Sequence, residues 1–208
     1  MQVFTISKGR DVIMAEQVLG KVPVGISNRH VHLSQEDLEK LFGEGYQLTN
    51  IKDLSQPGQF AAEETVTLVG PKGVLQRVRV LGPVRSKTQV EVSRTDAFAL
   101  GVRPPVRDSG ELNGSSGQVT VVGPKGAVTL SEGVILAKRH IHMTPADAEA
   151  FGLKDKEIVK IRCGGDRGLI FDQVLVRVRE DFALDCHLDT DEANAAMLNN
   201  GDEVEVLR

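Results

Sequence analysis

The chain has 208 residues, of which 40% are hydrophobic and 26% charged, and its formal net charge at pH 7 is −4. This length allows one large domain or two small ones, and the apolar fraction supports a packed core, which argues against wholesale disorder. The negative net charge does not favour binding to nucleic acid or to an anionic membrane. No stretch approaches the roughly 20 apolar residues of a membrane span. Two cysteines cannot make a disulfide scaffold and no signal-peptide pattern stands out, so we expect a cytoplasmic protein.

Short helices are expected at three places along the chain. Ser34 is placed to cap a helix over about 35–42, because a serine side chain accepts a hydrogen bond from the free N–H groups of the first turn. Thr144 precedes a proline that suits the first helical position, and Thr190 opens a third helix that ends near 199–201. Helices so few and short leave most of the chain to strands and turns.

Strands are predicted by apolar residues that alternate with polar ones, as they do on half-buried strands. This alternation occurs at 77–80, 89–92, 118–121, 174–179 and 203–206. Clusters of glycine, proline and asparagine separate these segments and are typical of turns. Many short strands at such spacing favour a barrel or sandwich over a doubly wound parallel sheet.

Two internal repeats connect distant parts of the chain. The stretch 29–34 (RHVHLS) recurs at 139–144 (RHIHMT), and the stretch 66–73 (VTLVGPKG) recurs at 119–126 (VTVVGPKG). The two repeats have different offsets, so the chain is not a plain tandem array. Two related barrel-like units with exchanged segments account for this pattern.

The clearest irregular stretch is 101–117, which contains paired prolines and a glycine/serine cluster. It is either a linker between domains or a loop that touches a ligand, because loops carried by a rigid scaffold often bind. Residues 1–20 form a weakly amphipathic segment, which we expect to be a frayed terminus or a helix packed on the surface.

The five histidines of the chain are concentrated in motifs typical of metal sites. Alternate residues of a strand point to the same face, so His30 and His32 can direct two imidazoles at one point, as can His140 and His142. Two imidazole nitrogens make half of a site for zinc or a similar divalent ion. His187 precedes a helix cap, as both pairs do, and is a candidate third ligand. The alternative is that two polar strand faces were inherited together by duplication.

Histidines alone do not complete two metal sites. Two metals with three protein ligands each need one ligand more than five imidazoles supply, and a carboxylate is the natural supplement. The pattern does not choose among the 29 acidic residues. Cys163 and Cys186 lack a Cys-x-x-Cys partner, and we expect Cys186 to be a buried small hydrophobe.

Five stretches of the chain together resemble one known family. They are 24–34, 82–91, 103–110, 137–143 and the region around His187. In sequence and order they resemble the phosphate propanoyltransferases, the PduL-type phosphotransacylases, from about residue 20 to the C-terminus. The family transfers an acyl group reversibly between coenzyme A and inorganic phosphate, so the resemblance implies acyl-CoA, CoA and phosphate as partners.

The resemblance also implies the architecture: a mainly β protein of two small β-barrel domains with short capping α-helices and segments exchanged between the halves. The implied division is an N-terminal extension at 1–20, a first barrel of 21–30 plus 138–208, a connecting insert at 31–59 and a second barrel at 60–137. Members are commonly homodimers. Whether residues 1–20 direct the protein into a bacterial microcompartment, to shell or cargo proteins, stays open.

Site residues follow from the resemblance position by position. Two Zn²⁺ ions are implied, one held by His30, His32 and Glu91 and the other by His140, His142 and His187. Arg85 is similar to the phosphate-binding arginine of the family, which suits a guanidinium because its fork matches phosphate oxygens bidentately. Coenzyme A contacts are implied at Ile26, Ser27, Asn28, Lys72, Arg79 and Asn194.

The expected reaction is direct attack of a phosphate oxygen on the thioester carbonyl, with two metals and Arg85 neutralising and orienting the phosphate. A serine–histidine–aspartate triad is not expected, because all five histidines are assigned to metals. Two alternatives remain: a dinuclear metal hydrolase of thioesters or phosphoesters, and a non-enzymatic β-barrel binding protein stabilised by metal. The preferred acyl chain is not fixed, so acetyl and propanoyl donors are both open.

Overall fold

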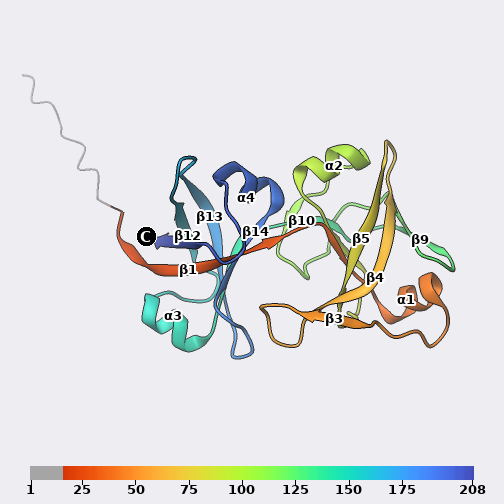
Figure 1. The fold of residues 1–208 in the computed structure, drawn as a ribbon, viewed down its shortest axis with the longest axis horizontal. Coiled ribbons are helices and arrows are strands. Elements are labelled where there is room, and N and C mark those ends of the chain that lie inside the picture. The colour runs from red at the N-terminus through yellow and green to blue at the C-terminus, as the bar shows by residue number, and fades with distance from the viewer. Residues whose placement is uncertain (1–15) are drawn as a thin grey trace, which may run out of the picture.

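The computed structural model of the chain describes residues 16–208, so the expected N-terminal segment at 1–20 lies mostly outside the described residues. The described part is mainly β and forms two sheets (Figure 1). One sheet closes into a six-stranded barrel, and the other is a curled nine-stranded sheet that stays open. The expected class, mainly β with two barrel-like units and short capping helices, is confirmed, with closure in one unit only.

The closed barrel joins the start of the described chain to its C-terminal third. Its strands, in spatial order, are β1 (Val18–Ser27), β14 (Asp185–Asp189), β11 (His140–Met143), β13 (Leu169–Val178), β12 (Ile158–Cys163) and β15 (Glu203–Leu207). The first strand, β1, runs parallel to β14 and antiparallel to β15. In Figure 1 it is the long red strand that leads from the barrel towards the other sheet. The barrel is therefore completed by a strand far away in sequence.

The curled sheet comes from the intervening part of the chain. Its strands are β7 (Val106–Arg107), β10 (Val134–Ala137), β6 (Gln89–Glu91), β2 (His30–His32), β5 (Val74–Gly82), β4 (Phe60–Val69), β8 (Val119–Val122) and β9 (Ala127–Leu130), with β3 (Asn50–Asp53) paired to β4. The short strand β2 leaves β1 after only two residues and enters the second sheet between β5 and β6. The two sheets are thus joined directly at the first histidine pair.

Each sheet has its own hydrophobic core, built from the residues that alternate inward along its strands. In the curled sheet, Val66 and Leu68 of β4 are buried with Val78 and Val80 of β5. In the barrel, Val174 and Val176 of β13 and Val204 and Val206 of β15 are buried in the same way. Burying one such side chain contributes about 1.5–3 kcal/mol, so these alternating residues stabilise each sheet separately.

Three of the four helices begin where the sequence predicted. They are α1 (Gln35–Phe42), α3 (Pro145–Phe151) and α4 (Thr190–Ala196). The last helix is shorter than expected, because Met197 adopts a left-handed conformation (φ 55°) that ends it before 199–201. Among the described residues, no helix is both long and apolar enough to cross a membrane.

The remaining helix, α2 (Arg94–Leu100), was missed. Ser93 accepts a hydrogen bond from the backbone of Asp96, and the Asp96 carboxylate accepts one from the backbone of Ser93. This reciprocal capping box is a sequence signal for a helix start. With only seven helical residues, however, the segment is too short to show a helical apolar period.

Candidate active site between the two sheets

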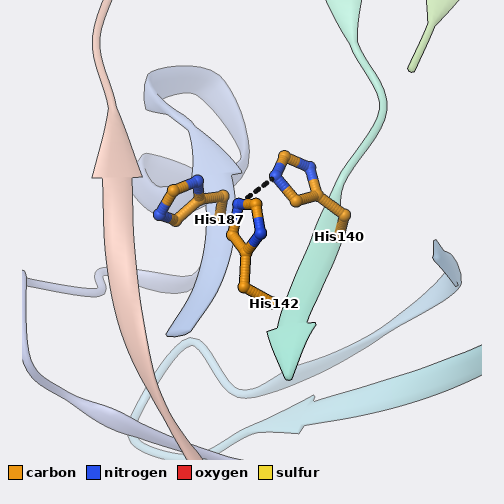
Figure 2. Close-up of side chains that lie close together, drawn as sticks. All are labelled: His140, His142 and His187. Carbon is orange, nitrogen blue, oxygen red and sulfur yellow. Dashed lines mark hydrogen bonds between the residues drawn. The ribbon is translucent and has the colours of Figure 1, made fainter. Parts of the chain in front are cut away.

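The structure gathers the predicted metal ligands into two groups of three. His140, His142 and His187 form one group and His30, His32 and Glu91 form the other; within each group the ligand atoms all lie within 4.8 Å of one another. Figure 2 shows the three rings of the first group turned towards a common point, two from β11 and one from β14. Each group supplies the three protein ligands that an open metal site uses.

Strand register explains how each group is completed. The pairing of β11 with β14 places His187 opposite His140. The pairing of β2 with β6 places Glu91 opposite His30 in the same antiparallel manner. Glu91 therefore takes, in the curled sheet, the position that His187 takes in the barrel. The third member comes from the neighbouring strand in both sheets.

Backbone carbonyls fix the tautomer of the first histidine of each pair. Nδ1 of His30 lies 2.8 Å from the carbonyl oxygen of Asn28, and Nδ1 of His140 lies 2.7 Å from that of Lys138. A proton on Nδ1 donates to the carbonyl, which leaves the Nε2 lone pair of each ring directed into its group. This is the usual arrangement around a metal-ligating histidine.

The second histidine of each pair is buried with a nitrogen that has no protein partner. Nδ1 of His32 and Nδ1 of His142 make no hydrogen bond to any residue within 16–208. Nε2 of His142 lies 3.0 Å from Nε2 of His140, which brings two imidazole nitrogens together at one point. A divalent ion suits this donor set of imidazole nitrogens and one carboxylate. The residues present therefore fit the implied metals.

Electrostatics keep the three-histidine group in a form able to bind metal. Burial, together with the charges of the neighbouring rings, lowers the pKa of His140 to about 4 and that of His142 to about 2. Both rings are consequently neutral near pH 7, as a ligand must be.

The other group differs because it contains a buried carboxylate. Burial lowers the pKa of His30, but the charge of Glu91, whose Oε2 lies 3.5 Å from Nε2 of His30, raises it overall. Burial likewise raises the pKa of Glu91, but His30 and a hydrogen bond from Ser109 bring it well below its usual range. Glu91 is therefore ionised and carries a negative charge into the group.

A hydrogen-bond network that sequence reasoning missed holds Glu91 in place. The hydroxyl of Ser109 donates to Oε1 of Glu91 at 2.7 Å, and the Gln89 amide donates to the same oxygen. The Gln89 amide also donates to Ser109 at 3.1 Å, while its own oxygen accepts from the backbone of Gly110 at 2.9 Å. The irregular stretch 101–117 thus reaches the site. Gln89 gave a signal, since it lies two residues from Glu91 and so on the same strand face.

A second network surrounds His187. Its Nε2 lies 3.0 Å from Oδ2 of Asp185, and the hydroxyl of Ser55 donates to the same oxygen. A proton on Nε2 leaves the Nδ1 lone pair of His187 for the metal group. Beside Ser55, the buried Gln56 donates to the carbonyl of Ala183 at 2.9 Å and accepts from its N–H at 3.2 Å. The loop after β3 therefore crosses from the curled sheet to the barrel, a contact that no local pattern could reveal.

Both metal groups open into one cleft of about 1040 Å³ between the sheets. Of the residues implied to contact coenzyme A, four line this cleft: Ile26, Ser27, Asn28 and Arg79. Two do not line it. Lys72 lies in the turn between β4 and β5, where its backbone donates to Leu100 at 3.0 Å, and Asn194 lies on α4.

Arg85 also lines the cleft, next to the group of His30, His32 and Glu91. Its backbone N–H donates to the carbonyl of Leu33 at 2.8 Å, which anchors the residue between β5 and β6. Burial lowers the pKa of its guanidinium and the charge of Glu91 raises it. Its side chain makes one long hydrogen bond, 3.5 Å to Ser109, and no ion pair with any residue from 16 onward. The guanidinium is available to an anion.

Comparisons with known proteins point to one family. The sequence profile of a family described as phosphate propanoyltransferase matches residues 23–199. A phosphate propanoyltransferase of Thermotoga maritima is 67% identical over 195 residues, which cover 92% of this chain and 92% of that protein. Proteins of the same name from Rhodopseudomonas palustris and Lachnoclostridium phytofermentans are each 53% identical, over 90% and 94% of this chain and 83% and 93% of their own lengths.

Proposed function

The chain belongs to the phosphate propanoyltransferase family and is a phosphotransacylase, and on that premise we propose how its residues perform the reaction. The substrates are a short-chain acyl-CoA, propanoyl-CoA or acetyl-CoA, and inorganic phosphate; the products are the acyl phosphate and CoA. The observation that supports this proposal best is that both candidate metal groups and Arg85 line a single cleft.

His30, His32 and Glu91 would hold one divalent ion, and His140, His142 and His187 the other. When bound, such ions supply Lewis-acid polarisation of carbonyl and phosphate oxygens, and zinc is the ion that this ligand set favours. The chain's own part is to keep these ligands neutral or anionic, to exclude bulk water and to hold two substrates against each other.

Arg85 binds the phosphate and orients one oxygen towards the thioester carbonyl. An oxygen of hydrogen phosphate forms the new carbon–oxygen bond, the carbon–sulfur bond breaks, and the phosphate proton passes to the departing thiolate of CoA. Ile26, Ser27 and Asn28 lie at the end of β1 beside the cleft, and we assign them, with Arg79, to coenzyme A. Lys72 and Asn194 stay predictions for the same ligand.

Transfer is direct, without an acyl-enzyme. Burial raises the pKa of the Cys163 thiol to about 11 and also raises that of Cys186, so neither presents a thiolate near pH 7. The histidines that could activate a serine are engaged in the two groups. Mass spectrometry of the protein after reaction with acyl-CoA in the absence of phosphate is expected to show no added acyl group. An acylated side chain would overturn direct transfer.

The proposed function is tested by thiol release from propanoyl-CoA and acetyl-CoA, each with and without phosphate. We expect release only with phosphate, accompanied by acyl phosphate that hydroxylamine traps. A dinuclear hydrolase would release thiol without phosphate, and a binding protein stabilised by metal would release none in either condition.

Arg85→Ala is expected to raise the KM for phosphate by about 10–100-fold, because a charge-assisted bidentate contact is lost, with little change in the KM for acyl-CoA. Initial rates over a matrix of both substrates measure this. Equal increases for both substrates would contradict the role of Arg85.

The barrel and the curled sheet are further proposed as two domains, 21–30 with 138–208 and 60–137, connected by 31–59. The separate hydrophobic cores support two units, and Val31, Leu33, Leu38 and Leu41 of the connecting segment pack into the core of the curled sheet. A homodimer is proposed from the family resemblance, and light scattering on the eluting protein tests it; a monomer would contradict it.

A further inference from the structure

Among the arginines that line the cleft, Arg177 has no role in the proposed function. It is on β13 of the barrel, paired in register with His142 on β11, and it is partly buried. The side chain of Arg177 makes neither a hydrogen bond nor an ion pair with any described residue, and its guanidinium carbon lies 5.6 Å from the centroid of the Phe182 ring. A partly buried arginine whose guanidinium has no partner is unusual, since charges removed from water are normally paired.

Arg177 and Arg85 come from different sheets, and the charge of Arg177 acts on Arg85. Burial lowers the pKa of both guanidinium groups, and the charge of Arg177 lowers that of Arg85 further. Glu91 is near enough to oppose this effect on both, but it forms an ion pair with neither. Two like charges held together in a partly desolvated cleft are stabilised by an anion between them.

Other charged groups around Arg177 do not satisfy it. Asp108 and Asp155 raise its pKa and Arg179 lowers it. Asp108 lies 3.8 Å from Lys156, and Asp155 accepts a hydrogen bond from the backbone of Val178 at 2.9 Å. Both carboxylates therefore have other partners, and the guanidinium fork of Arg177 remains open towards the cleft.

We propose that Arg177 is a second phosphate-binding residue, which holds inorganic phosphate from the barrel side while Arg85 holds it from the curled sheet. Hydrogen phosphate suits this pair because it carries two negative charges and offers enough oxygens for two bidentate guanidinium contacts. The inference rests on the proposed function, since it names a further residue for the same substrate. Binding by both arginines would also explain why the site lies between two sheets, because the phosphate is then oriented only when Arg85 and Arg177 are both in place.

The test measures phosphate binding directly, by titration calorimetry on the metal-loaded protein without acyl-CoA. Arg177→Gln is expected to raise the Kd for phosphate by about 10–100-fold, the effect of losing a charge-assisted hydrogen-bonding group. Arg177→Lys keeps the charge but loses the fork, so it should recover part of the affinity. Arg162→Gln is the matched control: Arg162 lies on the neighbouring strand β12, pairs with Glu205 at 3.1 Å and does not line the cleft, so its loss should leave the Kd unchanged.

Steady-state kinetics distinguish phosphate binding by Arg177 from a contact to the thioester carbonyl and from a contact to CoA. We expect the KM for phosphate to rise with the Kd while the KM for acyl-CoA changes less than about twofold. An unchanged phosphate Kd with a lower kcat would overturn the proposal in favour of a contact to the thioester carbonyl, and a raised Kd for CoA alone would overturn it in favour of a cofactor contact. The lysine variant carries the test if the glutamine variant does not fold. Absence of phosphate-dependent thiol release by the unaltered protein would instead overturn the proposed function.

Discussion

The barrel and the curled sheet carry the same Arg-His-x-His stretch, yet they complete it with different residues. In the barrel, the strand opposite His140 supplies His187; in the curled sheet, the strand opposite His30 supplies Glu91. Both histidine strands are buried at the centre of their sheets. The repeated stretch therefore determines where a candidate metal group lies, and the neighbouring strand determines which third side chain completes it.

The difference is visible in the electrostatics. Without a carboxylate among the ligands, burial and the charge of His187 bring the pKa of His140 to about 4, whereas Glu91 raises that of His30 despite nearly equal burial. The three-histidine group adds no charge of its own to a bound ion, while the other group adds one negative charge. The two groups are thus suited to different ligands within one cleft.

The largest effect is expected from removing one ligand of either group. His142→Gln and Glu91→Gln should each lower kcat/KM by about 10³-fold, because electrostatic stabilisation of the developing negative charge is lost. Initial rates with propanoyl-CoA and phosphate measure this, with Arg162→Gln as a control outside the cleft. If only one of the two variants lost activity, the groups would not share one active site.

A smaller effect is expected from replacing the residues that hydrogen-bond to Glu91 and to His187, the side chains that complete the two groups. Ser109→Ala removes one of the two hydrogen bonds to Oε1 of Glu91, and Asp185→Asn weakens the orientation of His187, so each should lower metal affinity by about 10–100-fold at its own group only. Competition with a metal-binding dye measures both affinities. Exposed Ser131→Ala is the matched control for the serine variant. Weakening of both groups by either variant would contradict the assignment of one supporting network to each group.

The smallest effect concerns the caps that follow the histidine strands. Thr144 caps α3 through a reciprocal capping box with Asp147, while in α1 the corresponding Asp37 instead accepts from Thr88 at 2.6 Å. Thr144→Ala and Ser34→Ala should each lower the free energy of unfolding by about 0.5–2 kcal/mol. Thr88→Ala should also lower the free energy of unfolding, because it removes the hydrogen bond to Asp37 in the first turn of α1. Urea denaturation measures these changes, and unchanged stability in all three variants would contradict the assignment of the caps.

The sequence predicted the parts of the fold and site that depend on local spacing. Alternation placed His30 and His32 on one face, and the helix starts at Ser34 and Thr144 follow from cap chemistry. From spacing alone Glu91 could not be selected, because its place depends on β2 and β6 pairing across a long separation in sequence. Its selection came from the family resemblance.

Other site residues were missed for similar reasons. Arg177 alternates with buried valines on β13 and is typical of a solvated strand face until the second sheet covers it. Ser55 and Gln56 join the site only through contacts between the two sheets. Residues whose role arises from the meeting of two sheets leave no local pattern.

The most direct test of this account is the metal content of the purified protein and two variants by elemental analysis. We predict two divalent ions per chain for the unaltered protein and one each for His142→Gln and Glu91→Gln, because each variant disables one group and leaves the other complete. A single ion in the unaltered protein, or two ions retained in both variants, would contradict the assignment of two separate metal groups.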